Sequence, residues 1–208
     1  MVGFLVEEIR DRVLYHLTAD RPYKRALVAG QKLEVGYEVN PYFGFYEGAR
    51  QYGVRRADGS MLQFKARAFL THVRDGKIQT DQYRLADIAA EVATHFVMLV
   101  RELVMEEVRK EVCPEAPSRQ RCLYVCESLE EARYWNKFLG DQGNIGSICS
   151  LLCNGLTHRA DTGLLLGDSE PLSVTRERAT RYWRGEAGDK PEWETLFVGN
   201  AVVTGIGL

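Results

Sequence analysis

The chain has 208 residues, 45% of them hydrophobic, which is enough to bury the core of a single domain over 1–208. Its 27 Lys and Arg residues against 29 Asp and Glu give a net charge of −2, so overall charge neither indicates nor excludes a nucleic-acid partner. Five cysteines, no secretory signal and no apolar run of the ~18 residues that span a membrane predict a cytoplasmic protein with free thiols and no membrane association.

Val13–Thr18 is β-branched and aromatic between charged and polar segments, which predicts a buried strand with His16 at its centre. Gly30–Gly36 predicts a short strand between glycine turns. Asn40–Tyr46 is expected not to be helical, because Pro41 fixes its own φ and pushes the preceding residue into an extended conformation. Its aromatic residues either pack over the core or form a stacking wall for a flat ligand ring, and both interpretations stay open.

Gly48–Arg84 is locally basic, with eight Lys and Arg residues against three Asp. The excess is either a phosphate-contacting face or an ordinary solvated surface. Leu62–Val73 has apolar residues at helical spacing and predicts a helix that ends at Gly76, although the alternation in Leu62–Leu70 also fits a strand.

Leu85–Glu111 is the clearest helix that the sequence predicts. Phe96–Val100 is apolar nearly all round, which predicts that this part is covered on two sides. His95 is expected to be structural. One apolar stripe is expected to face the core, and charged residues are expected to line the other side (stripe Leu85, Ile88, Val92, Phe96, Leu99 and Leu103; other side Asp87, Glu91, Arg101 and Glu102).

The second half of the chain predicts a strand at Cys122–Cys126 and then a helix. Ser128 and Glu131 form a capping box that starts this helix, which runs to Phe138. A further helix and four strands follow (helix Ser173–Trp183; strands Ile145–Cys153, Leu164–Leu166, Trp193–Val198 and Ala201–Gly207). The predicted class is therefore α+β, with a long helix between two groups of strands.

Two pairs of cysteines, Cys122 with Cys126 and Cys149 with Cys153, repeat a C-x-x-x-C spacing. Zinc sites usually place such pairs on turns, whereas these pairs lie in apolar, strand-like runs without a neighbouring histidine. Buried free cysteines and no metal are therefore expected, and a cysteine-ligated zinc module is kept as an alternative.

His16, Tyr124 and Glu194 lie on three separate predicted strands. Cleavage of a glycosidic bond to a pyridinium group passes through an oxocarbenium-like state, which a carboxylate near the ribose stabilises. A planar leaving group favours an aromatic neighbour, and a ribose hydroxyl favours a fixed polar group. The three residue types meet these needs if they line a single cleft.

The motifs around these residues resemble the His–Tyr–Glu class of ADP-ribosyltransferases. They are Tyr15-His-Leu-Thr18, Leu123-Tyr-Val125 followed by a Ser-capped helix, and a C-terminal strand with a glutamate. More specifically, Glu107-Val-Arg109, Pro114-x-x-Pro-Ser-Arg119, Ala179-x-x-Tyr-Trp-x-Gly185 and Glu194-x-Leu196 resemble a bacterial and phage family. That family includes the mRNA-modifying ADP-ribosyltransferase toxin of an anti-phage toxin–antitoxin–chaperone system.

The resemblance implies a split β-sheet core with a long central helix and a helical or loop insertion at about 44–84. It implies NAD as co-substrate without a metal, an RNA or protein acceptor, and possible antitoxin and chaperone partners. A non-catalytic nucleotide- or partner-binding domain is the alternative of another class. By position, the resemblance gives a catalytic set and a set of NAD contacts (catalytic Glu194, Tyr124 and His16; NAD contacts His16, Thr18, Arg119, Tyr124, Tyr134 and Trp135, with Tyr42 from the aromatic segment). Glu192 is expected to be an acceptor-side or solvated residue, and Asp161 is a further candidate.

Overall fold

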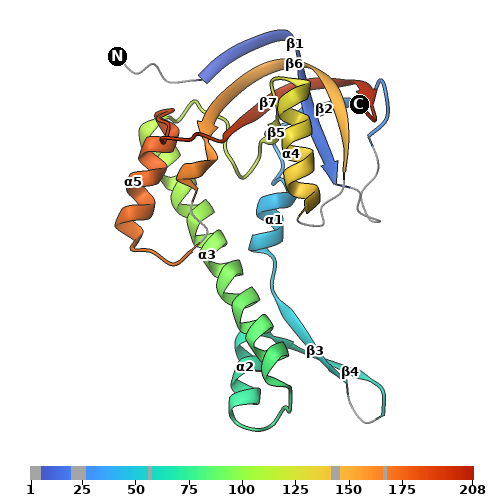
Figure 1. The fold of residues 1–208 in the computed structure, drawn as a ribbon, viewed down its shortest axis with the longest axis vertical. Coiled ribbons are helices and arrows are strands. Elements are labelled where there is room, and N and C mark those ends of the chain that lie inside the picture. Colours follow the sequence, from blue (N-terminus) through green and yellow to red (C-terminus); the bar gives the residue numbers. More distant parts are fainter. Residues whose placement is uncertain (1–5, 20–26, 56–57, 142–145, 166–167) are drawn as a thin grey trace.

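The computed structural model describes residues 6–19, 27–55, 58–141, 146–165 and 168–208, and Figure 1 shows their arrangement. The elements in chain order are β1 (Val6–Ala19), β2 (Lys32–Val35), α1 (Pro41–Glu47), β3 (Gln51–Arg55), β4 (Met61–Lys65), α2 (Ala66–Arg74), α3 (Gln82–Val112), β5 (Leu123–Val125), α4 (Leu129–Asp141), β6 (Gly146–Asp161), the short 3-10 helix η1 (Thr162–Leu164), α5 (Leu172–Trp183) and β7 (Trp193–Ile206). Helices flank a curled antiparallel sheet, which agrees with the predicted α+β class. None of the described helices is long and apolar enough to cross a membrane.

The main sheet curls until its two ends meet. β1 pairs with β6 and β6 with β7, and the other edge of β7 pairs with both β5 and β2. Just after β5, the main chains of Cys126 and Tyr15 of β1 exchange hydrogen bonds of 2.9 and 2.7 Å. The strands β1, β6, β7 and β5 therefore form a closed ring, which leaves fewer open sheet edges.

Two facing glycines allow β6 and β7 to approach closely within this ring. Gly155 lies opposite Gly199 in the register of the two strands, and Gly199 has a φ of 134°. A Cβ on Gly155 would lie 2.9 Å from the Cα of Gly199, and a Cβ on Gly199 would lie 2.7 Å from the Cα of Gly155. Any side chain here would push the strands apart, so the tight curl depends on both glycines.

The two faces of the sheet bury separate apolar clusters. The inside of the ring is filled by one cluster (Ile9, Leu14, Val125, Cys149, Leu151, Cys153, Phe197, Ala201 and Val203). On the outside, α3 and α5 pack over β7 and β6, with Trp183 and Tyr182 of α5 fully buried. Helix α4 covers a third cluster that includes Cys126 and Ile148. All five cysteines are buried as free thiols, as expected.

The prediction for α1 is wrong, because the segment around Pro41 is helical. Asn40 is the N-cap, with an extended backbone and a side-chain oxygen that accepts from the N–H of Phe43 at 2.9 Å. Pro41 occupies the first helical turn, where a missing N–H costs nothing and the fixed φ suits a helix. The extended residue that the sequence correctly places before Pro41 is thus the cap of a helix.

Helix α3 is present, but the burial expected of its faces is wrong. Phe96 and Leu103 of the predicted core stripe are 54% and 50% exposed, and Val100 is 41% exposed. Arg101 and Glu102, which were expected to face solvent, are 8% and 0% exposed. The reason is that α3 packs on the sheet only through its C-terminal half, where the buried face includes a charged pair.

Other expectations are met in part. The capping box starts α4, with the Glu131 N–H donating to Ser128 Oγ at 3.1 Å. Both interpretations of Leu62–Val73 hold in turn, since β4 ends at Lys65 and α2 starts at Ala66. The strand expected at 164–166 is wrong where the structure describes it, because Leu164 ends η1; residue 166 lies outside the described residues.

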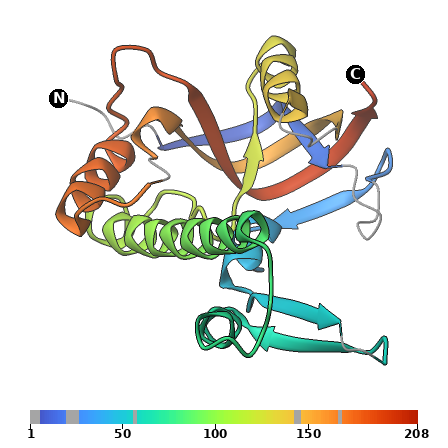
Figure 2. The same ribbon diagram turned by 60° about the horizontal axis from the view of Figure 1, so that its bottom comes forward.

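A long arm extends from the body of the molecule. It consists of the hairpin β3–β4, α2 and the N-terminal half of α3, and Figure 2 shows it projecting below the level of the sheet. Its small core contains Phe69, which is 1% exposed and lies against Tyr52 with ring centroids 5.6 Å apart. The arm overlaps the insertion expected at about 44–84.

Candidate functional site

The three strands predicted to carry the catalytic residues are neighbours in the closed ring. β5 with Tyr124 lies between β7, which carries Glu194, and β1, which carries His16. The sequence separates these strands by about 70 residues or more, and only the antiparallel closure brings them together.

Tyr124 and Glu194 point to the same face of the sheet. Tyr124 is opposite Leu196 in register, and Glu194 is two residues before Leu196 on β7. Because side chains alternate along a strand, all three lie on the outer face, against which α3 and α5 pack. Arg119, just before β5, connects the two candidates: its guanidinium donates to the Glu194 carboxylate, and its Cζ lies 5.4 Å from the centre of the Tyr124 ring.

Arg119 belongs to a buried chain of alternating charges. Its Nε donates to Glu102 Oε2 at 3.0 Å, and Arg101 Nη2 donates to the other oxygen of Glu102 at 2.9 Å. Two cations and two anions, with Glu194 as the last member, therefore sum to zero charge. Burial by itself raises the pKa of Glu102, but the two guanidinium groups outweigh it and hold that pKa below its usual value. Glu102 is thus ionised at neutral pH.

Glu194 is held through one of its two oxygens. The Tyr182 hydroxyl donates to Glu194 Oε1 at 2.6 Å, and Arg119 donates to the same oxygen and to the Tyr182 hydroxyl. Within the described part of the chain, Oε2 has no hydrogen-bond partner, and the Glu194 side chain is 13% exposed. Burial raises the pKa of Tyr182 well above its usual value, so its hydroxyl remains a donor. The result is a fixed carboxylate with one oxygen available.

The His16 side chain does not share the face of Tyr124 and Glu194. It alternates with Tyr15 and lies on the side of Leu14, towards the inside of the ring. Its Nδ1 donates to the main-chain oxygen of Tyr124 at 2.8 Å. This carbonyl points towards β1, as the main-chain groups of Cys126 do. The imidazole of His16 therefore lies between β1 and β5, next to the Tyr15–Cys126 bridge, where the main chains of the two strands are no longer paired. His16 therefore contacts Tyr124 through the main chain, and the expected single cleft is not formed by the three side chains directly.

Apart from Thr18, the remaining NAD-contact candidates fall into two groups, of which the first surrounds Tyr124. Tyr42 of α1 packs edge-to-face on Tyr124 with ring centroids 5.8 Å apart and accepts from Arg101 Nη2 at 2.6 Å. Arg119 is 3% exposed and bonded to three side chains, so its predicted contact with NAD would require those bonds to exchange. Thr18 lies at the end of β1, and its hydroxyl donates to the Ser147 carbonyl at 3.0 Å.

The second group adjoins the start of β7. The Tyr134 hydroxyl donates to Glu192 Oε1 at 3.0 Å, and the Trp135 ring nitrogen donates to the Trp193 carbonyl at 3.1 Å. A cavity of about 390 Å³ is lined by these four residues and others of α4. The aromatic pair thus contacts the two residues before Glu194. Asp161, the further candidate, accepts main-chain N–H groups of Gly163, Gly188 and Glu192 and so shapes the turn that leads into β7.

Sequence reasoning missed Glu102, Arg101 and Tyr182 as members of this site. Tyr182 entered the sequence analysis only as part of the motif Ala179-x-x-Tyr-Trp-x-Gly185. One signal was present for the other two: a charged pair within the long apolar part of a helix has to be either exposed or paired in the interior. Whether the Arg101–Glu102 pair is exposed or buried depends on which part of α3 packs on the sheet, and the spacing of apolar residues in the sequence does not indicate this.

Comparison with curated proteins of known identity finds no match. A family model matches residues 14–206, which include the end of β1 from Leu14 on, the arm and every candidate residue described above. The chain therefore belongs to the family described as "Protein of unknown function (DUF2441)".

Proposed function

We propose that this chain is an NAD-dependent ADP-ribosyltransferase with Glu194 as its catalytic carboxylate, and that RNA is the acceptor. The proposed fold is the ADP-ribosyltransferase-like split sheet. The divergence of β1 and β5 beyond the Tyr15–Cys126 bridge, with His16 in the gap, is in keeping with it.

In the proposed reaction, the bond between the nicotinamide nitrogen and the ribose carbon breaks, and its electron pair leaves with neutral nicotinamide. The ribose carbon develops positive charge, which a fixed carboxylate stabilises. An acceptor nucleophile then bonds to that carbon and loses its proton. Glu194 would bond a hydroxyl of the nicotinamide ribose, and Tyr124 would lie against the nicotinamide ring.

The observation that carries the proposal is that, within the residues that the structure describes, only one of the two carboxylate oxygens of Glu194 is hydrogen-bonded. Its Oε1 is fixed by Arg119 and Tyr182, while Oε2 is without a partner among the described residues. Glu194 lies on the same face of the sheet as Tyr124, two residues along β7 from the position opposite it. A purely structural ion pair gains from satisfying both oxygens. A carboxylate that is oriented through one oxygen and keeps the other available suits a group that binds a ribose hydroxyl. The adjoining aromatic rings of Tyr42 and Tyr124 suit a flat leaving group.

The decisive experiment measures nicotinamide release from NAD by the wild type and by Glu194→Gln, with Glu107→Gln as control. Glu107 lies on α3, and its side chain is 59% exposed. We expect release by the wild type and the control, and a loss of at least about 100-fold in Glu194→Gln, in line with removal of one stabilising group from a polar transition state. Equal rates in the wild type and Glu194→Gln would remove Glu194 from the mechanism, and no release by any of them would reject the transferase.

The acceptor is tested separately, with labelled NAD incubated with total RNA or with lysate protein. Label in RNA is expected. Label that enters protein and never RNA would reject the RNA acceptor and leave a protein-directed transferase.

A further inference from the structure

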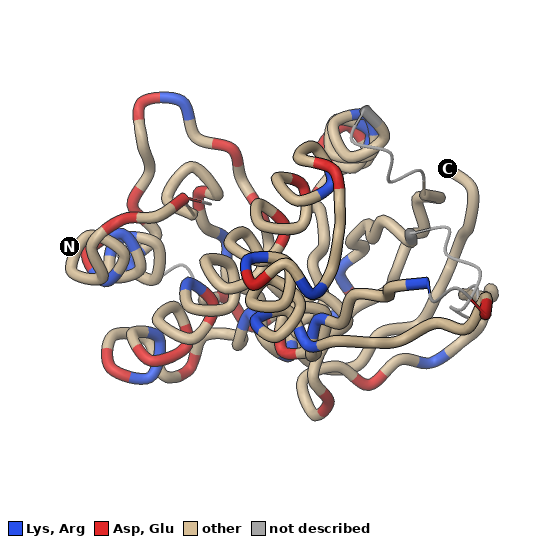
Figure 3. The backbone as a smooth tube through the Cα atoms, turned by 90° about the horizontal axis from the view of Figure 1, so that it is seen from below, with Lys and Arg blue, Asp and Glu red and all other residues tan. Residues whose placement is uncertain are grey.

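Residues 48–84, which make up most of the arm, carry a positive charge that the rest of the chain does not. Eight Lys and Arg residues against three Asp give residues 48–84 a charge of +5, whereas the whole chain has −2, so the remainder has −7. Figure 3 looks onto the arm from below, with the basic positions in blue. The sequence alone left open whether this excess is a binding face, and the structure adds where the charges gather.

A cavity on the arm collects four of these cations. It has a volume of about 590 Å³, lies between α2 and α3, and is lined by ten residues. Its basic members are Arg50, Lys65, Arg67 and Arg74, and no acidic residue lines it. The cavity beside α4 differs, because three glutamates and one arginine line it. The arm cavity is therefore the one of these two that suits an anion.

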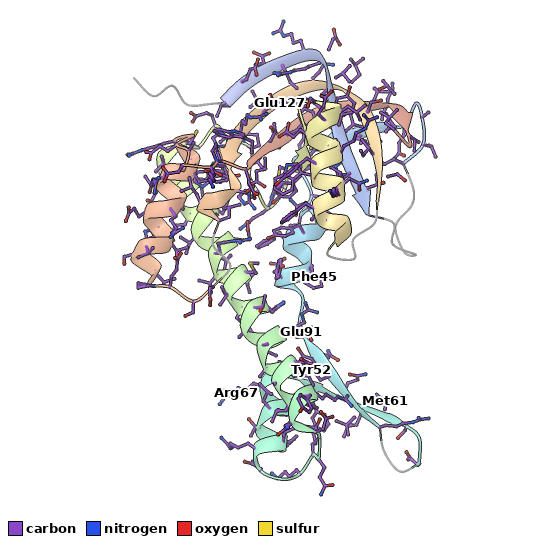
Figure 4. The ribbon with its side chains drawn as sticks, viewed as in Figure 1. Phe45, Tyr52, Met61, Arg67, Glu91 and Glu127 are labelled. Atoms are coloured by element: carbon purple, nitrogen blue, oxygen red, sulfur yellow. The ribbon has the colours of Figure 1, made fainter. Side chains whose placement is uncertain are left out.

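Two of the four cations are available for a ligand. Arg50 is paired with Glu91 of α3 at 3.2 Å, and Arg74 is paired with Asp75 at 2.9 Å. Lys65 and Arg67 are exposed, and within the described residues neither has a carboxylate partner. Figure 4 shows Arg67 on α2 pointing away from the arm. Two unpaired cations at the mouth of one cavity lower the cost of bringing a phosphate there.

The floor of the same cavity is apolar. Leu70 of α2 and Val92 and Phe96 of α3 line it, and the Phe96 side chain is 54% exposed. Phe96 is not exposed singly, because Val100 and Leu103 of the same helix are 41% and 50% exposed, and contiguous exposed apolar surface is typical of binding sites. Stacking of a base on an aromatic ring beside basic groups is the general form of single-stranded nucleic-acid binding. In a duplex the bases are stacked on one another and cannot contact the apolar residues of the cavity, so these residues favour a single strand.

We propose that the arm is a binding surface for single-stranded nucleic acid. Lys65 and Arg67 contact successive phosphates, and the intervening base lies on Phe96. The surface binds independently of NAD, so it stands or fails separately from the proposed transfer reaction.

The test measures the affinity of the NAD-free protein for a labelled 20-nucleotide RNA, and for DNA of the same sequence, by fluorescence anisotropy across a salt series. In K65Q/R67Q we expect at least a tenfold loss of affinity and a log K against log salt slope that is smaller by about 1.4, since each phosphate contact on a single strand contributes roughly 0.7. K32Q/K137Q removes the same two charges from exposed positions on the body and should bind as the wild type does. The charge-conserving K65R/R67K should also bind normally, which would assign the loss in K65Q/R67Q to the two missing charges.

Phe96→Ala separates stacking from charge. We expect it to weaken binding by roughly fivefold or more, the low end for one base on one aromatic ring, with the salt slope unchanged. Binding of RNA and DNA alike supports contact with backbone and bases, and binding of RNA alone supports added contacts with the ribose hydroxyl. The proposal is overturned if neither strand binds, if K32Q/K137Q loses as much affinity as K65Q/R67Q, or if labelled polyglutamate binds as tightly, which would indicate an acidic protein partner.

Discussion

Neutralising Glu102 is expected to destabilise the protein more than any exposed charge change on the same helix. Glu102→Gln keeps the shape of a side chain that is 0% exposed but leaves Arg101 and Arg119 with one carboxylate between them, a net charge of +1 in the interior. Removal of one partner from a buried ion pair costs about 3–5 kcal/mol. This is a large part of the roughly 5–15 kcal/mol by which domains of this kind are stable.

The control is Glu107→Gln, five residues further along α3. Its partner Arg176 lies 2.8 Å away, but the two side chains are 59% and 40% exposed. Exposed pairs contribute about 0.2–1 kcal/mol, so Glu107→Gln should shift stability by no more than that. Urea unfolding followed by circular dichroism gives both values. If the two substitutions cost the same small amount, the buried charges do not hold α3 to the sheet, and the reasoning is refuted.

Three further outcomes are expected. Tyr182→Phe removes the hydroxyl that fixes Glu194, so nicotinamide release should fall about 10- to 100-fold while NAD affinity stays the same, and equal kcat values would show that Tyr182 does not position the carboxylate. Burial lowers the pKa of His158 to about 4, so the unfolded chain binds a proton before the folded one does, and stability should fall as pH drops from about 6.5 towards 4. His158→Phe should flatten that dependence, measured by urea unfolding at several pH values, and an unchanged slope would assign it to other groups. Finally, thiol reagents at pH 8 should modify the native protein far more slowly than the unfolded one, as measured by mass spectrometry. The reason is that burial raises the pKa of each cysteine (Cys113 to about 11, Cys126 and Cys153 to about 12, Cys122 and Cys149 also upward). Rapid labelling of the native protein would contradict this.

Local patterns predicted much of the secondary structure, and their failures have physical reasons. Ser128 and Glu131 marked the start of α4 because a capping box involves only neighbours in sequence. Pro41 was misjudged because an extended residue before proline fits both a loop and an N-cap, and the choice depends on whether an Asn side chain reaches back to the helix.

The candidate site was predictable to a smaller extent. Tyr124 and Glu194 were assigned to strands, and their common face follows from register, which depends on how the sheet closes. The side of His16 and the burial of Glu102 depend on contacts between residues far apart in sequence. Alternation and helical periodicity define faces, but they do not say which face another element will cover.

Helix α3 belongs to both the arm and the body. Val92 lines the arm cavity, and Glu102, ten residues later on the same uninterrupted helix, is the anchor of the charge chain that ends at Glu194. At 1.5 Å per residue these positions are about 15 Å apart along a stiff rod. A single-stranded nucleic acid bound at the arm would thus place near the sheet a nucleotide that lies a fixed number of nucleotides from the bound one. Lengthening α3 by a full turn would change that number.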